Sequence, residues 1–395
     1  MLIKDLKFYV LEGPPRARGV ESRASIEKVP PGLSGLFTHS PGFQGLRPEG
    51  FVEYRDERPK PTYSSVLRLV LEGGMSASLP FGSGFHREDV EWEARGFKAV
   101  IGPLLIGVDA FDREYLWQRL WYAQRFFYTG RRAVELIDTL LWDFASRFFR
   151  LPIYRLLGGY REKIPAYRNI SGDTIEQLVA DAVRAKDQGY KGCKDHSYRG
   201  VKGNIELARE LRAAVGDDFL LLHDPVESYT YDEAVKVGRA LEELDYVWME
   251  EPLQDYDIMG LKKLCDTLDL PILAMEWVGS VGGQPYNASG FLALGATDIV
   301  RQRGVGITGQ MKLAHLAEGF GVDVHGGNPH VILAIKNDPL FEAVPSKIPP
   351  PQEGERMTPL GRTVLEHGYM SIAWGLDPPE GPDWDEIQKK ALAVI

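Results

Sequence analysis

Three acidic side chains follow short apolar runs at a constant interval. Asp224 ends the run FLLLHD, Glu250 ends YVWME and Glu276 ends PILAME. The first two acids are 26 residues apart, and so are the second and third. One strand–helix unit takes roughly 30 residues in a barrel of about 250 residues. The interval therefore predicts that the three carboxylates occupy equivalent points on three neighbouring strands.

Three carboxylates that meet in a low-dielectric site need a compensating cation. Hard oxygen ligands suit Mg²⁺, which keeps positions open for water or substrate, whereas Zn²⁺ favours His and Cys. We therefore expect Asp224, Glu250 and Glu276 to hold one Mg²⁺ per subunit. Taken singly, each acid could equally cap a helix or pair with an arginine. Glu251, on the opposite side of an extended chain from Glu250, is expected to form a structural ion pair.

Basic residues flank this acidic set. Lys194 ends YKGCK one unit earlier, and His325 ends the later run VDVH. Both could exchange a proton with a substrate at the same mouth. The register of VDVHGGNPH also leaves His330 as an alternative to His325. His223, inside FLLLHD, is expected to be a satisfied core histidine.

The elements that position these residues form a regular series. From Lys163 onward, short apolar runs alternate with helical stretches, and eight such runs can be counted. This alternation predicts a parallel sheet closed into a (β/α)₈ barrel, whose strands all end at one mouth. The chain before residue 131 is less regular. It contains strand-like runs and a Gly/Pro-rich stretch at 30–50, which favours a packed loop.

The bulk composition excludes several classes of protein. A net charge of −10 argues against a nucleic-acid partner. Two cysteines cannot form a disulfide framework, which favours a reducing compartment. No apolar run approaches the roughly 20 residues that cross a bilayer, and the first residues lack the apolar core of a signal peptide. These features predict a soluble cytoplasmic protein without membrane contact.

With these residues placed, the chain resembles the enolase superfamily, in its mandelate racemase branch, over about residues 131–345. LLLHDPV, VWMEEPL and PILAMEW resemble the three metal-ligand strands of that family. GYKGCKDH resembles its Lys-x-Lys element, with His196 where a second Lys often stands. GITGQMKLAHLAEGFGVDVHGG resembles the sixth helix and the seventh strand with its basic histidine. LFEAVP resembles the eighth strand, whose glutamate, here Glu342, hydrogen-bonds the substrate carboxylate.

The resemblance implies a domain plan and further site residues. It implies a modified TIM-type barrel over residues 131–364. An α+β capping domain would comprise residues 1–130, completed by a C-terminal tail from about 365 to 395. Capping loops set specificity in this family, so His39 and Trp277 join Glu342 as candidates for substrate binding. The family also favours homo-oligomers, from dimers to octamers.

The chemistry implied by the resemblance is removal of the proton next to a carboxylate, giving a metal-stabilised enediolate. Lys194, His196 and His325 are the candidate catalytic residues. We expect dehydration of a sugar acid to a 2-keto-3-deoxy acid. A racemase, epimerase or cycloisomerase using the same intermediate is the nearest rival. A glycoside hydrolase with two catalytic carboxylates and a non-catalytic relative that binds metal and ligand are alternatives from other classes.

The sequence departs from the family pattern near the sixth strand. His325 is usually oriented by an aspartate there, but no acid occurs between Asp298 and Glu318. Without such a partner His325 is expected to act mainly as a donor or acid, with Lys194 as the base. Arg301 and Arg303 follow this strand and could bind an acidic substrate or form ion pairs elsewhere.

Overall fold

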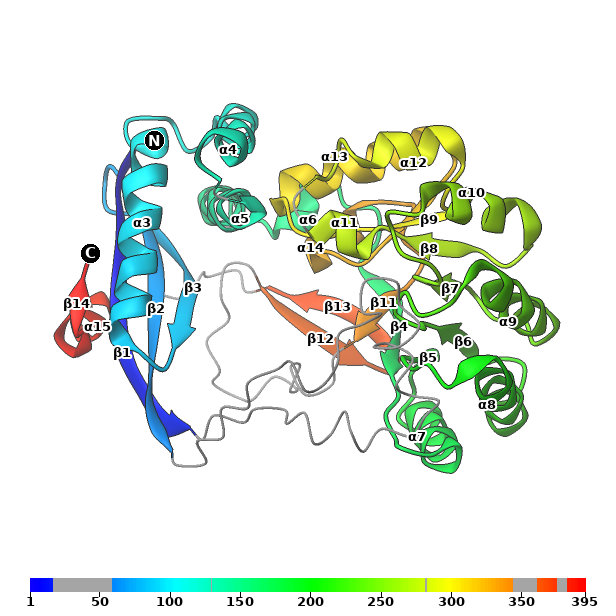
Figure 1. Ribbon diagram of the computed structural model, residues 1–395. Coiled ribbons are helices and arrows are strands. Elements are labelled where there is room, and N and C mark those ends of the chain that lie inside the picture. Colours follow the sequence, from blue (N-terminus) through cyan, green and yellow to red (C-terminus); the bar gives the residue numbers. More distant parts are fainter. Residues whose placement is uncertain (17–58, 129, 281–282, 344–360, 375–381) are drawn as a thin grey trace.

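The computed structural model describes residues 1–16, 59–128, 130–280, 283–343, 361–374 and 382–395. Two sheets organise these residues, a four-stranded sheet and a larger sheet that forms the barrel (Figure 1). Within the described residues no helix is both long and apolar enough to cross a membrane.

The four-stranded sheet is antiparallel and has the strand order β14-β1-β2-β3. Its strands are β1 (Ile3–Arg16), β2 (Lys60–Leu71), β3 (Ser76–Gly84) and β14 (Ala393–Val394). In β2, buried residues alternate with less buried ones, as a strand with one face on a core requires. That core contains Phe8, Leu67 and Leu69, which pack against helices.

Helices α3 (Arg87–Leu105), α4 (Arg113–Phe127), α5 (Gly130–Phe149) and α6 (Ile153–Leu156) lead from this sheet to the barrel. The buried face of α5 joins the core of the four-stranded sheet. The same helix also contacts α13 (Gly306–Gly319) of the barrel. In addition, the Trp117 indole N–H donates to the Val305 carbonyl at 2.8 Å. These contacts join the two parts of the molecule.

The eight expected apolar runs form eight parallel strands. They are β4 (Lys163–Asn169), β5 (Gly192–Asp195), β6 (Leu220–His223), β7 (Met249–Glu250), β8 (Ile272–Ala274), β9 (Ile299–Arg301), β10 (Asp323–His325) and β11 (Phe341–Ala343). Strands β4 to β10 pair in chain order, and β11 pairs in parallel with β4. The last strand thus returns to the first, and the predicted barrel is confirmed.

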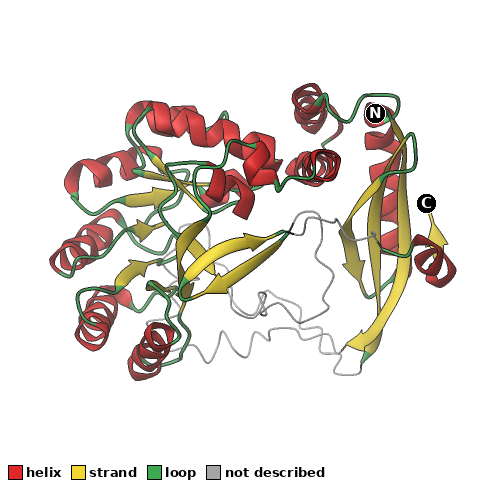
Figure 2. Cartoon of the chain, turned by 180° about the vertical axis from the view of Figure 1, so that it is seen from behind, coloured by secondary structure: helices red, strands yellow, loops and turns green. Residues whose placement is uncertain are grey.

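Helices cover the outside of the barrel (Figure 2). They are α7 (Ile175–Asp187), α8 (Gly200–Val215), α9 (Tyr231–Glu243), α10 (Ile258–Thr267), α11 (Glu276–Ser280), α12 (Ala288–Leu294), α13 and α14 (Pro329–Ala334). Thr174 and Thr230 begin α7 and α9 with reciprocal capping boxes, which satisfy backbone N–H groups at those ends. The outer core lies between these helices and the strands.

Alternation along each short strand separates an inner from an outer face. Leu222 packs inside the barrel with Tyr167 and Trp248, whereas Leu221 belongs to the core under the helices. Lys194 and Asp224 follow the inner parity of their strands, and Asp195 and His223 follow the outer one. Neighbouring residues therefore enter different environments.

The C-terminal region differs in part from the expected capping tail. The hairpin β12 (Arg362–Glu366) and β13 (Tyr369–Ala373) extends the barrel sheet, because β13 pairs antiparallel with β4. Of the described C-terminal elements, α15 (Trp384–Lys390) and β14 lie against the four-stranded sheet, where β14 pairs with β1. The hairpin, which falls within the expected capping tail from about residue 365, thus joins the barrel sheet. The domain limits stay predictions.

Candidate active site

The three predicted ligands lie near the C-terminal ends of neighbouring strands, but at unequal heights. Asp224 comes directly after β6, and Glu250 is the last residue of β7. Glu276 does not end a strand, because β8 stops at Ala274 and Glu276 opens the short helix α11. Its backbone is redirected at Met275, which has φ +81° and whose N–H donates to the Asp255 carboxylate at 2.7 Å.

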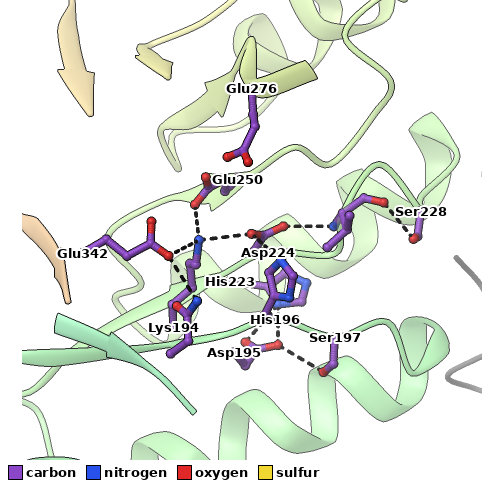
Figure 3. Close-up of polar contacts among 12 residues, drawn as sticks. Lys194, Asp195, His196, Ser197, His223, Asp224, Ser228, Glu250, Glu276 and Glu342 are labelled. Atoms are coloured by element: carbon purple, nitrogen blue, oxygen red, sulfur yellow. Dashed lines mark hydrogen bonds and ion pairs between the residues drawn. The ribbon is translucent and has the colours of Figure 1, made fainter. Parts of the chain in front are cut away.

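Lys194 binds the carboxylates on its side of the mouth (Figure 3). Its Nζ lies 2.7 Å from Glu250 Oε2, 3.1 Å from Asp224 Oδ2 and 3.5 Å from Glu342 Oε1. Burial lowers the pKa of Lys194, but the charge of Glu250 and its neighbours outweighs burial and raises the pKa well above its ordinary value. In this state Lys194 is an ammonium ion.

Arg301, the last residue of β9, binds the carboxylates on the other side of the mouth. Its Nε lies 3.4 Å from Glu250 Oε1 and 2.9 Å from Glu276 Oε2, and its Nη2 binds Glu342. Arg303 forms a further ion pair with Glu276. Arg301 and Arg303 were expected either to bind an acidic substrate or to form ion pairs, and the structure contains the ion pairs. Burial opposes ionisation of Glu250, yet Arg301 and Lys194 lower its pKa to about 2.

The donor set fits a hard divalent cation. Asp224, Glu250 and Glu276 offer carboxylate oxygens, the ligand type that Mg²⁺ prefers. Glu250 Oε1 is buried and has no hydrogen-bond partner in the described structure, which leaves a coordination position to be satisfied. The three carboxylates are held apart by intervening cations, so metal binding requires Lys194 and Arg301 to yield part of their contacts.

A second acidic cluster lies beside the mouth. Ligand atoms of Glu227, Glu251 and Asp255 lie within 4.8 Å of one another, the only such group of three in the described residues. Glu251 forms no ion pair with any described residue, so the expected structural ion pair is wrong. Burial, followed by the charges of Asp224 and Glu276, raises its pKa to about 10. Glu251 is therefore a neutral carboxyl group at neutral pH.

Left-handed backbone is concentrated at these strand ends. Val226, Glu227, Glu251 and Met275 all have positive φ, between +43° and +81°. Such conformations cost side-chain-bearing residues about 1–3 kcal/mol each and tend to gather at functional sites. Here they turn the chain sharply where the carboxylates are presented.

Four of the histidines considered from the sequence belong to the described barrel and have distinct environments. His196 is half exposed, and its Nε2 lies 3.3 Å from Asp224 Oδ2, so it borders the mouth. His325 is fully buried on the inner face of β10. His330 lies in α14, accepts a hydrogen bond from the backbone N–H of Tyr154 and stacks on the Tyr154 ring. It therefore does not replace His325. His223 is paired in the outer core, as expected.

His325 has an acidic partner that the sequence analysis missed. Its Nδ1 lies 3.4 Å from Oδ1 of Asp338, a long hydrogen bond between two fully buried groups. The expectation that His325 lacks such a partner is therefore wrong. Asp338 comes from the segment before β11 rather than from the sixth strand. An acid four residues before Glu342 was the available signal, because a chain segment entering β11 passes close to β10.

The candidate substrate-binding residues are placed unevenly. Glu342, in β11, is one-sixth exposed and binds both Lys194 and Arg301. Trp277 follows Glu276 in α11 and is half exposed. His39 lies outside the described residues.

Comparisons with known proteins agree with this geometry. A family model for the "Enolase C-terminal domain-like" family matches residues 177–382. Arabinonate dehydratase of Saccharolobus solfataricus is 30% identical over 269 residues, 62% of this chain and 69% of that protein. L-Ala-D/L-Glu epimerase of Clostridium acetobutylicum is 27% identical over 255 residues, 63% of this chain and 68% of that protein.

A solved structure matches over the full length. The crystal structure of D-glucarate dehydratase from Agrobacterium tumefaciens, complexed with magnesium, superposes with a TM-score of 0.75 and 26% identity, covering 100% of both chains. That superposition, the family match and the eight-stranded barrel agree with one another. The chain belongs to the enolase superfamily, in the branch of mandelate racemase and muconate lactonizing enzyme.

Proposed function

We propose that this chain is a Mg²⁺-dependent dehydratase that converts a sugar acid into a 2-keto-3-deoxy acid. The observation that carries the proposal is that the buried amine of Lys194 binds Asp224 and Glu250 at one barrel mouth, where Arg301 in turn binds Glu250 and Glu276. Two relatives named as dehydratases, one of them crystallised with magnesium, support the same chemistry.

Asp224, Glu250 and Glu276 would hold the ion. When bound, Mg²⁺ supplies positive charge where a second negative charge develops on the substrate carboxylate. The chain itself supplies the three carboxylates and, before an ion binds, the countercharges of Lys194 and Arg301 that hold them at the mouth. It also excludes water, since Glu250 is 0% exposed and Lys194 is 2% exposed.

Lys194 is the proposed base for the α-proton. Its ion pairs with Asp224 and Glu250 favour the charged ammonium in the present state. With those carboxylates bound to a cation of their own, the ion pairs would weaken, Lys194 would release its proton to solvent, and the neutral amine could then accept the α-proton. His196, whose Nε2 lies 3.3 Å from Asp224 Oδ2 at the exposed edge, is positioned to contact the hydroxyl groups of a bound sugar acid.

Arg301 and Glu342 would orient the substrate. Arg301 Nη1 is buried and lacks a hydrogen-bond partner among the described residues, so it can donate to an incoming carboxylate or hydroxyl oxygen. Glu342 lies beside it and accepts from Asn169 Nδ2 at 3.1 Å. A mouth lined by charged groups suits a polyhydroxy acid better than an aromatic acid.

Epimerisation is the second candidate, because the Clostridium acetobutylicum relative, which matches a similar share of this chain, is named as an epimerase. It would use the same proton abstraction but return a proton to carbon. A panel of arabinonate, mannonate, glucarate and galactarate salts with MgCl₂ separates the two, since only dehydration gives a 2-keto acid that semicarbazide detects. The proposal predicts such a product and its loss in EDTA. Activity that survives EDTA would favour a metal-independent hydrolase instead, and no turnover of any acid would favour a non-catalytic relative.

A further inference from the structure

A cavity of about 330 Å³ lies between α5 and the segments that follow β9 and β10. Its size is at the lower end of the range of small-molecule sites, about 300–1,000 Å³. Among the described residues that line it, none is a proposed metal ligand. The polar side chains of the lining include Arg131, Glu135, Thr139, Gln302, Arg303 and Gln310.

The walls of this cavity are fixed by hydrogen bonds within the protein. Gln310, in α13, donates from Nε2 to the Gly304 carbonyl at 3.0 Å and accepts at Oε1 from the Asn328 N–H at 2.7 Å. This side chain fastens the segment after β9 to the segment after β10. Gln284 Oε1 also accepts from the Arg303 N–H at 2.9 Å. The cavity is therefore preformed.

Arg131 brings an unpaired positive charge to the cavity. It is the second residue of α5, and it forms no hydrogen bond or ion pair with any described residue. Its side chain crosses Gly304 so closely that a Cβ there would lie 2.8 Å from Arg131 Cδ and Nη1. The helix dipole opposes a cation at this end and favours an anion. The other helix that begins here, α13, is already capped, because Asp138 Oδ2 accepts from the Thr308 N–H at 2.8 Å.

Glu135 brings an unpaired acceptor to the same cavity. It lies four residues after Arg131, a spacing that permits an ion pair on a helix, but neither side chain has a charged partner among the described residues. In the same lining, Gln302 is 0% exposed, and neither atom of its side-chain amide has a partner within the described structure. A guanidinium and a carboxylate on one cavity suit a molecule that carries both an anionic group and hydrogen-bond donors.

We propose that this cavity binds a small hydroxy acid, whose carboxylate is bound by Arg131 and whose hydroxyl groups donate to Glu135. The forked guanidinium matches a carboxylate through two parallel N–H groups. Arg303 also lines the cavity and binds Glu276 at the mouth. The hydroxy acid is therefore either a separate molecule or the far end of a diacid that reaches from the mouth. The inference goes beyond the proposed dehydration, because binding here requires neither metal nor turnover.

The first test is a calorimetric titration of metal-free protein in EDTA with sodium mannonate. We expect a binding event that weakens by about tenfold in Arg131→Gln, because one charge-assisted contact is lost. Arg131→Lys should recover only part of the affinity, since an ammonium lacks the fork. Arg125→Gln, the same change on an exposed side chain of α4, should match the parent. No binding by the parent, or a titration of folded Arg131→Gln that superposes on the parent's, would overturn the proposal.

A second titration tests the class of ligand with hexanoate, which has a carboxylate but no hydroxyl groups. Glu135→Leu should weaken mannonate by about tenfold and leave hexanoate unchanged. Equal losses for both acids would contradict the role of Glu135. Tighter binding of L-glutamate than of mannonate in the parent would overturn the hydroxy-acid class.

Crystals of the metal-free protein soaked in sodium glucarate identify the source of the acid. A separate molecule would lie in the cavity alone, whereas the far end of a diacid would give density that continues from Arg131 to Arg301. Absence of density beside Arg131 would overturn the proposal. None of these measurements depends on turnover, so their outcome is independent of the dehydratase assignment.

Discussion

Two Asp–His–Tyr arrays lie on opposite faces of the barrel strands. The array of Asp338, His325 and Tyr167 lies on the inner side of the strands, and the array of Asp195, His223 and Tyr229 lies under the helices. Both are buried, and the outer one has the shorter hydrogen bonds to its carboxylate. The two arrays therefore share residue types and order and differ in the side of the strands on which they lie.

The same contrast applies to single residues along a strand. Glu250 faces inward and is paired with Lys194 and Arg301, whereas Glu251 turns away and has no cationic partner among the described residues. One carboxyl is held ionised and its neighbour is held neutral. Inner positions should therefore control turnover, and outer positions should control stability.

The inner carboxylate should give the largest effect. Glu250→Gln preserves shape but removes a charged oxygen ligand, so we expect turnover to fall by at least about 10³-fold. Steady-state assays with saturating MgCl₂ and a thermal melt would measure this. Retained activity in a folded Glu250→Gln protein would contradict the assignment of Glu250 as a metal ligand.

Lys194→Ala should abolish the first half of the reaction. Loss of the base is expected to slow α-proton exchange in D₂O by about 10²–10⁴-fold. Lys191→Ala is the matched control, because Lys191 lies three residues earlier and stacks on Tyr369 away from the mouth. Equal exchange rates in the parent and in Lys194→Ala would assign the base elsewhere.

A substitution on the outer side of the strands should change the free energy of unfolding without changing turnover. Asp181 in α7 binds Arg168 at 2.8 Å, and both side chains are more than nine-tenths buried. Asp181→Asn leaves Arg168 without its buried countercharge, which should cost about 3–5 kcal/mol of unfolding free energy. Urea denaturation would measure the loss, with exposed Asp217→Asn as control. An unchanged kcat in the folded fraction of Asp181→Asn would support the contrast between inner and outer positions. A loss of kcat in the folded protein would contradict that contrast.

Glu251→Gln should have the smallest effect at neutral pH, with turnover close to the parent. The pKa of Glu251 is raised by burial, in contrast to the pKa of Asp181, which Arg168 holds well below its ordinary range. The folded protein therefore keeps a proton on Glu251 that the unfolded chain releases above about pH 4.3. Stability of the parent should fall relative to Glu251→Gln as pH rises towards 10, by up to about 1.4 kcal/mol per unit. Melting temperatures from pH 5 to 9 would detect this, and a constant difference would contradict it.

Local patterns in the sequence were sufficient for much of this fold and site. Strand–helix alternation predicted the barrel, and the spacing of Asp224, Glu250 and Glu276 predicted which acids approach one mouth. Asp338 was missed because its contact with His325 depends on how a non-repeating segment enters β11. The contact of the Tyr167 hydroxyl with His325 had no signal in the sequence, since sequence alone does not show how far a buried hydroxyl reaches. The environment of Glu251 also depends on a sharp turn with positive φ, which no periodicity reveals.

The most direct test of the account is a crystal structure of the protein soaked in MnCl₂ as a Mg²⁺ substitute, with the ion located by its anomalous signal. The account predicts one ion bound by oxygens of Asp224, Glu250 and Glu276, with Arg301 and Lys194 moved from their present contacts. A structure with no ion among these three carboxylates, or with its only ion at Glu227, Glu251 and Asp255, would contradict it.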